Sequence, residues 1–202
     1  LPSVAAIVLA AGESSRMRHP SGEPKQLLTF HGEPLVRRAA RTAIDASCDP
    51  VILVLGAHAE RILPLLQGLP VRIANNPQWA AGMGASIHVG LAEVLQHAPN
   101  VAALLIVLCD QPLVSAGDLQ ELIRMHRESG KSLVAAFYAE TVGPPVLIGR
   151  DHFPDLAALP EGVGAKALLT RFPAELATVP MPHAAVDVDT PTDYARLRGE
   201  RR

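Results

Sequence analysis

Short apolar runs alternate with amphipathic stretches in the first half of the chain, and this alternation limits the folds open to it. The expected strands are Val4–Leu9, Val51–Leu55, Val71–Ile73 and Ala103–Leu108, and the expected helices lie near Pro34–Ala46, Ala59–Gln67 and Ala85–Gln96. Strands that alternate with helices form parallel sheets through right-handed crossovers, with helices on both faces. We therefore predict a three-layer α/β/α Rossmann-like fold with a mostly parallel sheet.

The second half of the chain is less regular. An amphipathic helix is expected over Asp118–Glu128, and strands are expected over Ser132–Tyr138 and Pro145–Ile148. The 202 residues are 49% hydrophobic, which is enough to bury a sizeable core. Because no internal repeat or long linker interrupts the pattern, we expect residues 1–202 to form one domain.

Composition and charge exclude several classes of protein. The net charge is -2, whereas a nucleic-acid-binding surface needs clustered excess Lys and Arg, so we expect no nucleic-acid partner. No stretch approaches the roughly 18 apolar residues of a membrane-spanning helix, so we expect no membrane partner. Cys48 and Cys109 are too few and too far apart for a disulfide framework, which favours a cytoplasmic protein.

The first expected strand runs into a turn with the features of a phosphate-binding loop. Gly12 lets backbone N–H groups turn toward an anion, and Arg16 supplies a guanidinium fork that matches phosphate oxygens. Lys25 would be a second cation for the same polyphosphate. The alternative is an ordinary strand-to-helix turn with a solvated arginine. The predicted nucleotide-binding residues of this region are Leu9, Ala10, Ala11, Gly12, Arg16 and Lys25.

Asp110 directly follows the most apolar of the expected strands. The carboxyl ends of parallel strands form the usual ligand crevice of an open α/β sheet, so Asp110 and Gly12 should lie near each other. Magnesium prefers one or two carboxylates together with substrate phosphates, which makes Asp110 a candidate metal ligand. The alternative is a turn aspartate that caps the next helix, but Ser115 is the better cap candidate.

A second acidic segment lies near the end of the chain. We expect Asp187 and Asp189 to face opposite sides, so that one points into the crevice while the other meets backbone or solvent. Asp189 is our choice for the second metal carboxylate, with Asp187 as the supporting alternative. Thr190 and Pro191 resemble the first positions of a last helix, so Asp193 in its first turn is expected to be structural.

The segment 75–87 is a glycine-containing loop that opens a helix. Gly82 and Gly84 would permit close approach of a flat ligand, and backbone N–H groups with Ser86 would read a nucleobase or ribose. The same loop holds Trp79, the only tryptophan of the chain. A lone tryptophan is more often a packing anchor than a stacking platform, and we favour that interpretation.

A third candidate site lies at residues 162–166, where two glycines precede Lys166 and a helix. This turn would form a second anion site, with Lys166 reaching toward phosphate. The alternative is a flexible turn with a surface lysine. The eight histidines show no metal-ligand spacing, so we expect each to lie on the surface or to be a satisfied core residue.

Taken together, these motifs resemble those of the molybdenum cofactor cytidylyltransferases, from end to end of the chain. That family is related to the molybdenum cofactor guanylyltransferases and the sugar-nucleotide pyrophosphorylases. The matching motifs are Leu9-Ala10-Ala11-Gly12 with Arg16-Met17, Lys25-Gln26-Leu27-Leu28, the Asn-Pro-x-Trp-Ala-x-Gly-Met segment 76–83, Cys109-Asp110-Gln111-Pro112-Leu113, Pro145–Arg150 and Asp187-Val188-Asp189-Thr190-Pro191.

The resemblance implies a nucleotidyltransferase fold and a defined reaction. In it, the terminal phosphate of molybdopterin attacks the α-phosphorus of CTP, and pyrophosphate leaves. Arg16 and Lys25 would hold the β- and γ-phosphates, and Asp110 and Asp189 would hold Mg²⁺. Arg16, Lys25 and Asp110 are the expected catalytic residues. Asp187 and Lys166 are possible acceptor-binding residues, and a molybdoenzyme is a possible partner that receives the cofactor.

Two departures from the family pattern keep other functions open. The segment Arg18–Glu23 makes the gap before Pro24-Lys25 longer than usual, as in sugar pyrophosphorylases, and Glu161 stands one residue before the usual place of an aspartate. The alternatives are a sugar- or alcohol-phosphate nucleotidyltransferase, a guanylyl-transferring relative, or a non-catalytic cofactor carrier. An NADP-linked reductase is a further alternative, although the chain has no Gly-x-Gly-x-x-Gly loop.

Overall fold

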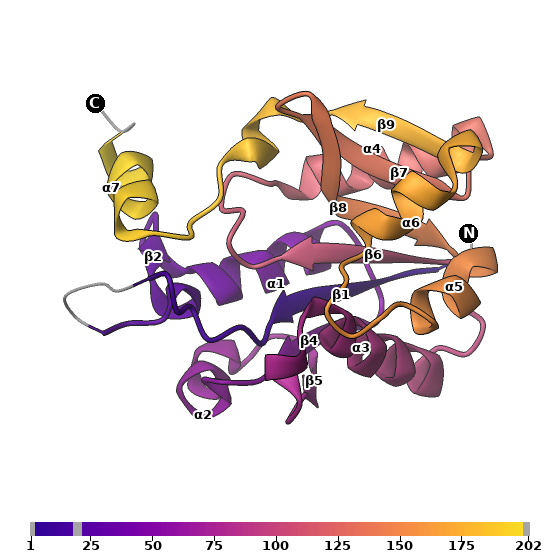
Figure 1. Ribbon diagram of the computed structural model, residues 1–202. Coiled ribbons are helices and arrows are strands. Elements are labelled where there is room, and N and C mark those ends of the chain that lie inside the picture. Colours follow the sequence, from indigo (N-terminus) through magenta and orange to yellow (C-terminus); the bar gives the residue numbers. More distant parts are fainter. Residues whose placement is uncertain (1–2, 18–21, 200–202) are drawn as a thin grey trace.

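The computed structural model describes residues 3–17 and 22–199, and it contains a seven-stranded sheet, a two-stranded sheet and helices on both sides (Figure 1). The strands are β1 (Val4–Ala10), β2 (Thr29–Phe30), β3 (Glu33–Pro34), β4 (Val51–Leu55), β5 (Arg72–Asn75), β6 (Ala103–Leu108), β7 (Leu133–Tyr138), β8 (Thr141–Gly149) and β9 (Leu176–Pro180). The α-helices are α1 (Leu35–Asp45), α2 (Ala59–Ile62), α3 (Met83–His97), α4 (Ala116–Ser129), α5 (Phe153–Ala157), α6 (Lys166–Arg171) and α7 (Pro191–Gly199).

The main sheet has the strand order β5-β4-β1-β6-β8-β7-β9. All neighbouring strands pair in parallel except β8, which runs antiparallel to both β6 and β7. The predicted mostly parallel sheet is therefore confirmed. The sequence interpretation did not include β9, which extends the sheet beside β7 as an edge strand.

Side chains of β1 alternate between two hydrophobic clusters, one on each face of the sheet. Ala6 and Val8 pack into the cluster that also contains side chains of α1 and α4. Ala5 and Ile7 pack into the cluster formed with α3, α5 and α6. Because successive residues of a strand point to opposite faces, a strand covered on both sides is apolar throughout, and every residue of β1 is buried. The two clusters join the sheet to a layer of helices on each face, which gives the three layers that the alternation predicted.

A third, smaller cluster fixes the end of the chain against the segment that follows the first loop. Val188, Tyr194 and Leu197 pack there against Phe30 and Leu35. The Tyr194 hydroxyl also donates a hydrogen bond to the carbonyl of Thr29 at 2.9 Å. In Figure 1, α7 accordingly lies beside β2, at the edge of the sheet where β1 and β6 end.

Some predicted elements differ from the observed ones. The helix expected over Ala59–Gln67 ends as an α-helix at Ile62 and continues as a 3₁₀ turn over Leu63–Leu66, because Pro64 has no N–H group for an α-helical hydrogen bond. The strand expected at Val71–Ile73 is displaced toward the carboxyl terminus, to Arg72–Asn75. No helix among the described residues is long and apolar enough to span a membrane.

Candidate functional site

The carboxyl ends of β1 and β6 lie next to each other, as the sequence predicted. Leu9 pairs with Leu108 in register, so Gly12 and Asp110 leave the sheet at the same edge. A cavity of 370 Å³ opens there. It is lined by these residues from the prediction: Leu9, Ala10, Ala11, Gly12, Lys25, Gly82, Ser86 and Asp110. A 490 Å³ cavity beside Ser3 and Ser47, at the amino-terminal end of β1, has none of the predicted site residues in its lining.

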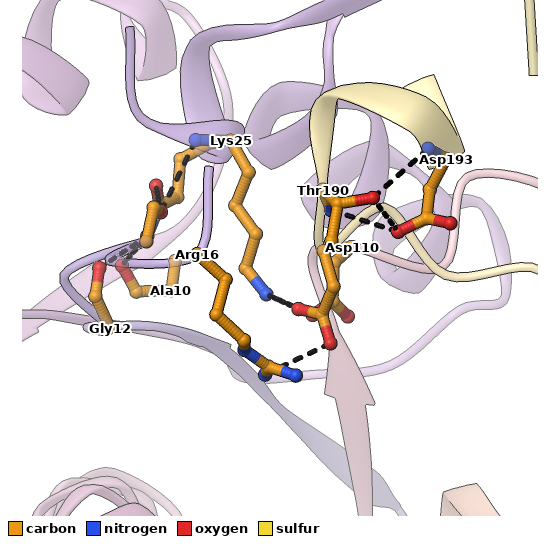
Figure 2. A network of polar contacts seen from close by, with 10 residues as sticks. Ala10, Gly12, Arg16, Lys25, Asp110, Thr190 and Asp193 are labelled. Carbon is orange, nitrogen blue, oxygen red and sulfur yellow. Dashed lines mark hydrogen bonds and ion pairs between the residues drawn. The ribbon is translucent and has the colours of Figure 1, made fainter. Parts of the chain in front are cut away.

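The predicted cations and carboxylates contact one another beside this cavity. The Lys25 ammonium lies 2.5 Å from Asp110 Oδ2 and 2.7 Å from Asp189 Oδ1. The Arg16 guanidinium lies 2.9 Å from Asp189 Oδ2. Figure 2 shows Lys25 and Arg16 extending from the first loop toward the carboxylates. We call Arg16, Lys25, Asp110 and Asp189 the lysine–aspartate cluster.

Burial and charge oppose each other at Lys25. Burial by itself lowers the pKa of a lysine, because it penalises the charged form. The charge of Asp110 and the hydrogen bonds to Asp110 and Asp189 outweigh burial, so the pKa of Lys25 is raised above its ordinary value. Lys25 is thus a permanent cation in this cluster.

Asp189 reaches the cluster because the chain before it is anchored to β6. The N–H group of Val188 donates to the carbonyl of Asp110 at 2.9 Å, and the Val188 side chain is fully buried in the third hydrophobic cluster. After Asp189, the Thr190 hydroxyl accepts from the N–H of Asp193, and the Asp193 carboxylate accepts from the N–H of Thr190. This reciprocal cap confirms the structural role expected for Asp193.

The expectation that Asp187 and Asp189 face opposite sides is wrong. Burial, followed by the charges of Asp189 and Asp110, raises the pKa of Asp187, so the charges of these two carboxylates act on it. The physical reason is the period of two in an extended chain, which places residues i and i+2 on the same side. Val188, the residue between the two aspartates, is fully buried, as this period allows for a side chain that points to the other side.

The glycines of the segment 75–87 are explained by packing against protein backbone rather than by a flat ligand. A Cβ on Gly84 would lie 2.3 Å from the carbonyl of Pro160, and one on Gly82 would lie 2.7 Å from the Cα of Gly162. Gly82 also has a φ of +126°, which disfavours a side chain. Ser86 accepts a hydrogen bond from Asn76, and Gly84 does not line the cavity. Gly82 and Ser86 still border the cavity.

Of two further predicted residues, Trp79 lines the cavity and Lys166 does not. Trp79 is partly buried against the hydrophobic cluster on the α3 side, as expected of a packing anchor, and it also lines the cavity. Lys166 lies outside the cavity lining, where its ammonium donates to the hydroxyl of Thr141 at 2.6 Å. Of the unusual segment Arg18–Glu23, residues 18–21 lie outside the described residues.

Sequence reasoning missed several residues of the cavity wall. The lining residues without a predicted role in the site, although some belong to the matching motifs, are Glu13, Ser15, Gln26, Ala80, Met83, Leu108 and Cys109. Of these, Gln26 is 1% exposed, which is unusual for a polar side chain next to a lysine. Burial raises the pKa of Cys109 to about 12, so its thiol stays protonated and uncharged near neutral pH.

The carboxylates fit a divalent cation that also binds a substrate. Asp110 Oδ1 is buried, and no hydrogen-bond partner for it exists among the described residues. A buried carboxylate oxygen without a partner is costly, and a cation would satisfy it. The described part of the chain contains no group of three or more His, Cys, Asp or Glu side chains arranged to hold a metal. A metal here would therefore need ligands from the substrate, as Mg²⁺ commonly has.

Comparison with known proteins adds to this geometry. The chain is 32% identical to nicotine blue oxidoreductase of Paenarthrobacter nicotinovorans over 98% of its own length and 97% of that protein. It superimposes on the structure of Rv0371c from Mycobacterium tuberculosis with a TM-score of 0.77, at 28% identity and 97% coverage of each chain. That mycobacterial protein has also been crystallised as a complex with manganese.

A nucleotidyl transferase from Methanothermobacter thermautotrophicus gives a TM-score of 0.80 at 25% identity, covering 98% of this chain and 97% of the other. Both structural neighbours thus share the whole fold, from β1 to α7. The family model of the MobA-like NTP transferase domain matches residues 6–178, which include most of β1, Lys25, Asp110 and most of the sheet. The chain therefore belongs to the MobA-like NTP transferase family, and it is a nucleotidyltransferase-type enzyme.

Proposed function

We propose that this protein transfers CMP from CTP to the terminal phosphate of a molybdopterin-type cofactor and releases pyrophosphate. The observation that carries the proposal is the convergence of Lys25, Asp110 and Asp189 at the rim of a cavity lined by the Gly12 loop. Membership of the MobA-like family supports nucleotidyl transfer in general. The choice of CTP and of the pterin acceptor rests on the motif resemblance described above.

The reaction requires positioning and charge neutralisation more than a strong base. A phosphate monoester is already anionic near neutral pH, so an oxygen of the acceptor can attack the α-phosphorus without prior deprotonation. A new P–O bond forms, and the bond to the bridging oxygen of the β-phosphate breaks with its electron pair on pyrophosphate. Arg16 and Lys25 would leave their carboxylate partners to neutralise the triphosphate.

Mg²⁺ is the proposed cofactor, and the residues that would hold it are Asp110 and Asp189. When bound, it supplies charge neutralisation at the α-phosphate and at the attacking oxygen. The manganese complex of the mycobacterial relative supports a divalent metal at this fold, although it belongs to that protein. Asp187, whose pKa is raised by burial and by the neighbouring carboxylates, would add negative charge beside the same position.

The first experiment measures pyrophosphate release with each of the four NTPs and Mg²⁺, with and without the molybdenum cofactor. Release that requires both CTP and the cofactor supports the proposal. A preference for GTP, or for a sugar phosphate as the acceptor, would replace the substrates while keeping the reaction class. The proposal also includes a cytoplasmic location. It further includes delivery of the product to a molybdoenzyme, and a pull-down with the loaded protein would test that interaction.

A second candidate function is favoured by one relative. Nicotine blue oxidoreductase is 32% identical over nearly the whole chain, and its name assigns redox chemistry to that protein. The described residues offer no disulfide, because Cys48 and Cys109 are both buried free thiols. A reductase would therefore need a bound redox cofactor, and for a nicotinamide dinucleotide the nucleotide half would occupy the 370 Å³ cavity.

The two candidates separate in one assay. Oxidation of NADH or NADPH with quinone-type dyes, without pyrophosphate release from any NTP, would favour the reductase. Pyrophosphate release without any oxidation of NADH or NADPH would favour nucleotidyl transfer. A carrier without catalysis predicts tight cofactor binding and neither signal.

A further inference from the structure

We propose that Gln26 is a positioning residue for anion binding, which holds the loop from Ala10 to Ser14 so that its backbone N–H groups remain available to phosphate oxygens. The inference rests on the proposed function, because it concerns the loop that would hold the triphosphate. It goes further by assigning a task to a side chain that has no direct part in the chemistry. The contacts of Gln26, of Ser14 and of the loop carbonyls carry the argument.

Gln26 is buried and uses its whole amide group on the loop. Its Nε2 donates to the carbonyl of Ala10 at 3.2 Å and to the carbonyl of Gly12 at 2.8 Å. Its Oε1 accepts from the hydroxyl of Ser14 at 2.9 Å. A buried primary amide that is satisfied at both ends by one loop of five residues fixes the shape of that loop.

Ser14 also takes part in the hydrogen bonds that fix the shape of the loop. Its backbone has a φ of +60°, which is uncommon and unfavourable for a residue with a Cβ atom. The Ser14 hydroxyl donates to Gln26 and accepts from the N–H group of Lys25 at 3.2 Å. The Ser14 hydroxyl therefore links the strained turn both to the side chain of Gln26 and to the backbone of Lys25.

The carbonyl groups of the loop are all directed at protein donors. Those of Ala10 and Gly12 accept from Gln26, and that of Ala11 accepts from the N–H of Ala57 at 3.1 Å. The carbonyl of Glu13 lies 2.9 Å from His58 Nε2. With the acceptors used in this way, the loop presents few oxygens that would repel an anion.

In contrast to the carbonyl groups, two N–H groups of the loop have no hydrogen-bond acceptor among the described residues. In a trans peptide, the N–H of one residue points away from the carbonyl of the residue before it. The N–H of Glu13 therefore points away from Gln26, and the N–H of Gly12 points away from Ala57. Neither N–H donates a hydrogen bond within the described part of the chain. Both residues line the cavity, so these donors are available to a bound phosphate.

The test uses inorganic tripolyphosphate with Mg²⁺ as the probe, because its binding depends on neither the base nor the acceptor. Binding is measured by calorimetry for the wild type and for Gln26→Met, which keeps the length of the side chain but removes its hydrogen bonds. We expect at least a tenfold loss of affinity, equivalent to about 1.4 kcal/mol. Gln26→Glu keeps the acceptor for Ser14 but loses both donors, and it should bind equally weakly.

Ser14→Ala and Ser132→Ala form a matched pair. Each removes one serine hydroxyl that has two hydrogen-bonding neighbours, but Ser132 contacts Glu175 and His152, away from the cavity. Ser14→Ala should weaken tripolyphosphate binding several-fold and raise the KM for the NTP more than it lowers kcat. Ser132→Ala should leave both quantities unchanged. This pair keeps the inference testable even if the Gln26 variants do not fold.

The outcomes are distinguishable from failure of the proposed function. If the wild type binds tripolyphosphate but is inactive with CTP, the substrate assignment fails and the role of Gln26 remains measurable. If folded Gln26→Met and Ser14→Ala proteins bind tripolyphosphate as tightly as the wild type, the inference is overturned. Equal losses in Ser14→Ala and Ser132→Ala would also overturn it, because they would show a general effect on stability.

Discussion

Two clusters of polar and charged side chains lie at opposite ends of the strands of the main sheet. They differ in how many of their polar atoms have a hydrogen-bond or ion-pair partner. The lysine–aspartate cluster lies where β1 and β6 end, borders a cavity, and leaves Asp110 Oδ1 without a partner among the described residues. The second, which we call the His152 cluster, lies at the ends from which β7 and β9 begin. It consists of Ser132, His152, Asp155 and Glu175.

The His152 cluster is closed. The ring of His152 is 4% exposed, with Nδ1 3.3 Å from Asp155 Oδ2 and Nε2 2.9 Å from Glu175 Oε2. The Ser132 hydroxyl donates to the same Glu175 oxygen at 2.6 Å. A serine, a histidine and an aspartate are in contact here, one after the other. The serine hydroxyl, however, donates its proton to a carboxylate and not to the ring, so Ser132 is no activated nucleophile.

The difference teaches how to separate structural from functional charge in this fold. Every ring nitrogen and hydroxyl of the His152 cluster has a protein partner, so the cluster links β7, β9 and α5 and needs no ligand. The lysine–aspartate cluster keeps an unpartnered buried oxygen, the cation Lys25 in the cavity lining and the exposed cation Arg16, which are groups that a metal and a polyphosphate would use. The comparison gives four predictions.

The largest effect is expected for Asp110→Asn. Loss of the carboxylate removes the charge that would hold the metal at the α-phosphate, so turnover should fall roughly a hundredfold or more. Nucleotide affinity should change much less, since Lys25 keeps Asp189 as a partner. Steady-state kinetics of pyrophosphate release measure both. Asp155→Asn is the matched control in the His152 cluster and should leave turnover unchanged; unimpaired turnover of Asp110→Asn would refute the assignment.

The second prediction concerns stability instead of turnover. His152→Leu removes the donor that lies between two carboxylates while roughly keeping the buried volume, so the free energy of unfolding should fall by about 2 kcal/mol. Urea unfolding monitored by circular dichroism gives this quantity. Activity per folded molecule should match the wild type. A loss of activity without a loss of stability would show that the closed cluster is functional after all.

The third prediction tests whether Lys25 occupies the place of a metal in the free protein. Lys25→Met removes the cation that now neutralises Asp110 and Asp189, so Mn²⁺ without nucleotide should bind more tightly, by roughly tenfold. Binding of tripolyphosphate should weaken in the same variant. Electron paramagnetic resonance of free Mn²⁺ measures the first effect. Unchanged Mn²⁺ affinity would mean that Lys25 and the metal do not compete.

The smallest effects are opposite pH dependences at the two edges. Burial and the charges of Asp189 and Asp110 raise the folded-state pKa of Asp187, so its ionisation destabilises the fold above the unfolded value of about 3.9. Asp187→Asn should therefore raise the free energy of unfolding at pH 7. Well below the unfolded value the carboxyl is protonated in both states, and the variant should match the wild type.

Glu175 should show the reverse. Hydrogen bonds from Ser132 and His152 lower its folded-state pKa, so its stabilising contribution is present above the unfolded value of about 4.3 and is lost as the pH falls through the lowered one. Glu175→Gln should lower stability at pH 7 and have little effect in acid. Unfolding curves of both variants at pH 3 and pH 7 test the pair, and effects of the same sign would contradict it.

Much of the site could be located from the sequence because its residues follow the ends of strongly apolar strands. For this reason the sequence predicts that Gly12 and Asp110 lie together, and the register of β1 and β6 confirms it. The ion pairs of Lys25 with both carboxylates were not foreseen, because sequence motifs assign cations to phosphates and say nothing of the partners they have without a ligand. The sequence does not show a role for Gln26 for a similar reason, since its burial depends on contacts with the loop carbonyls of Ala10 and Gly12.

The sequence by itself determined the alternating order of strands and helices, the apolar strand centres and the caps at Ser115 and Thr190, because these depend on neighbouring residues and on periodicity. Only the tertiary structure decided that β9 joins the sheet beside β7, that Gly84 packs against the carbonyl of Pro160, and that Lys25 pairs with both Asp110 and Asp189. These features depend on contacts between residues distant along the chain, and no local pattern encodes such distances.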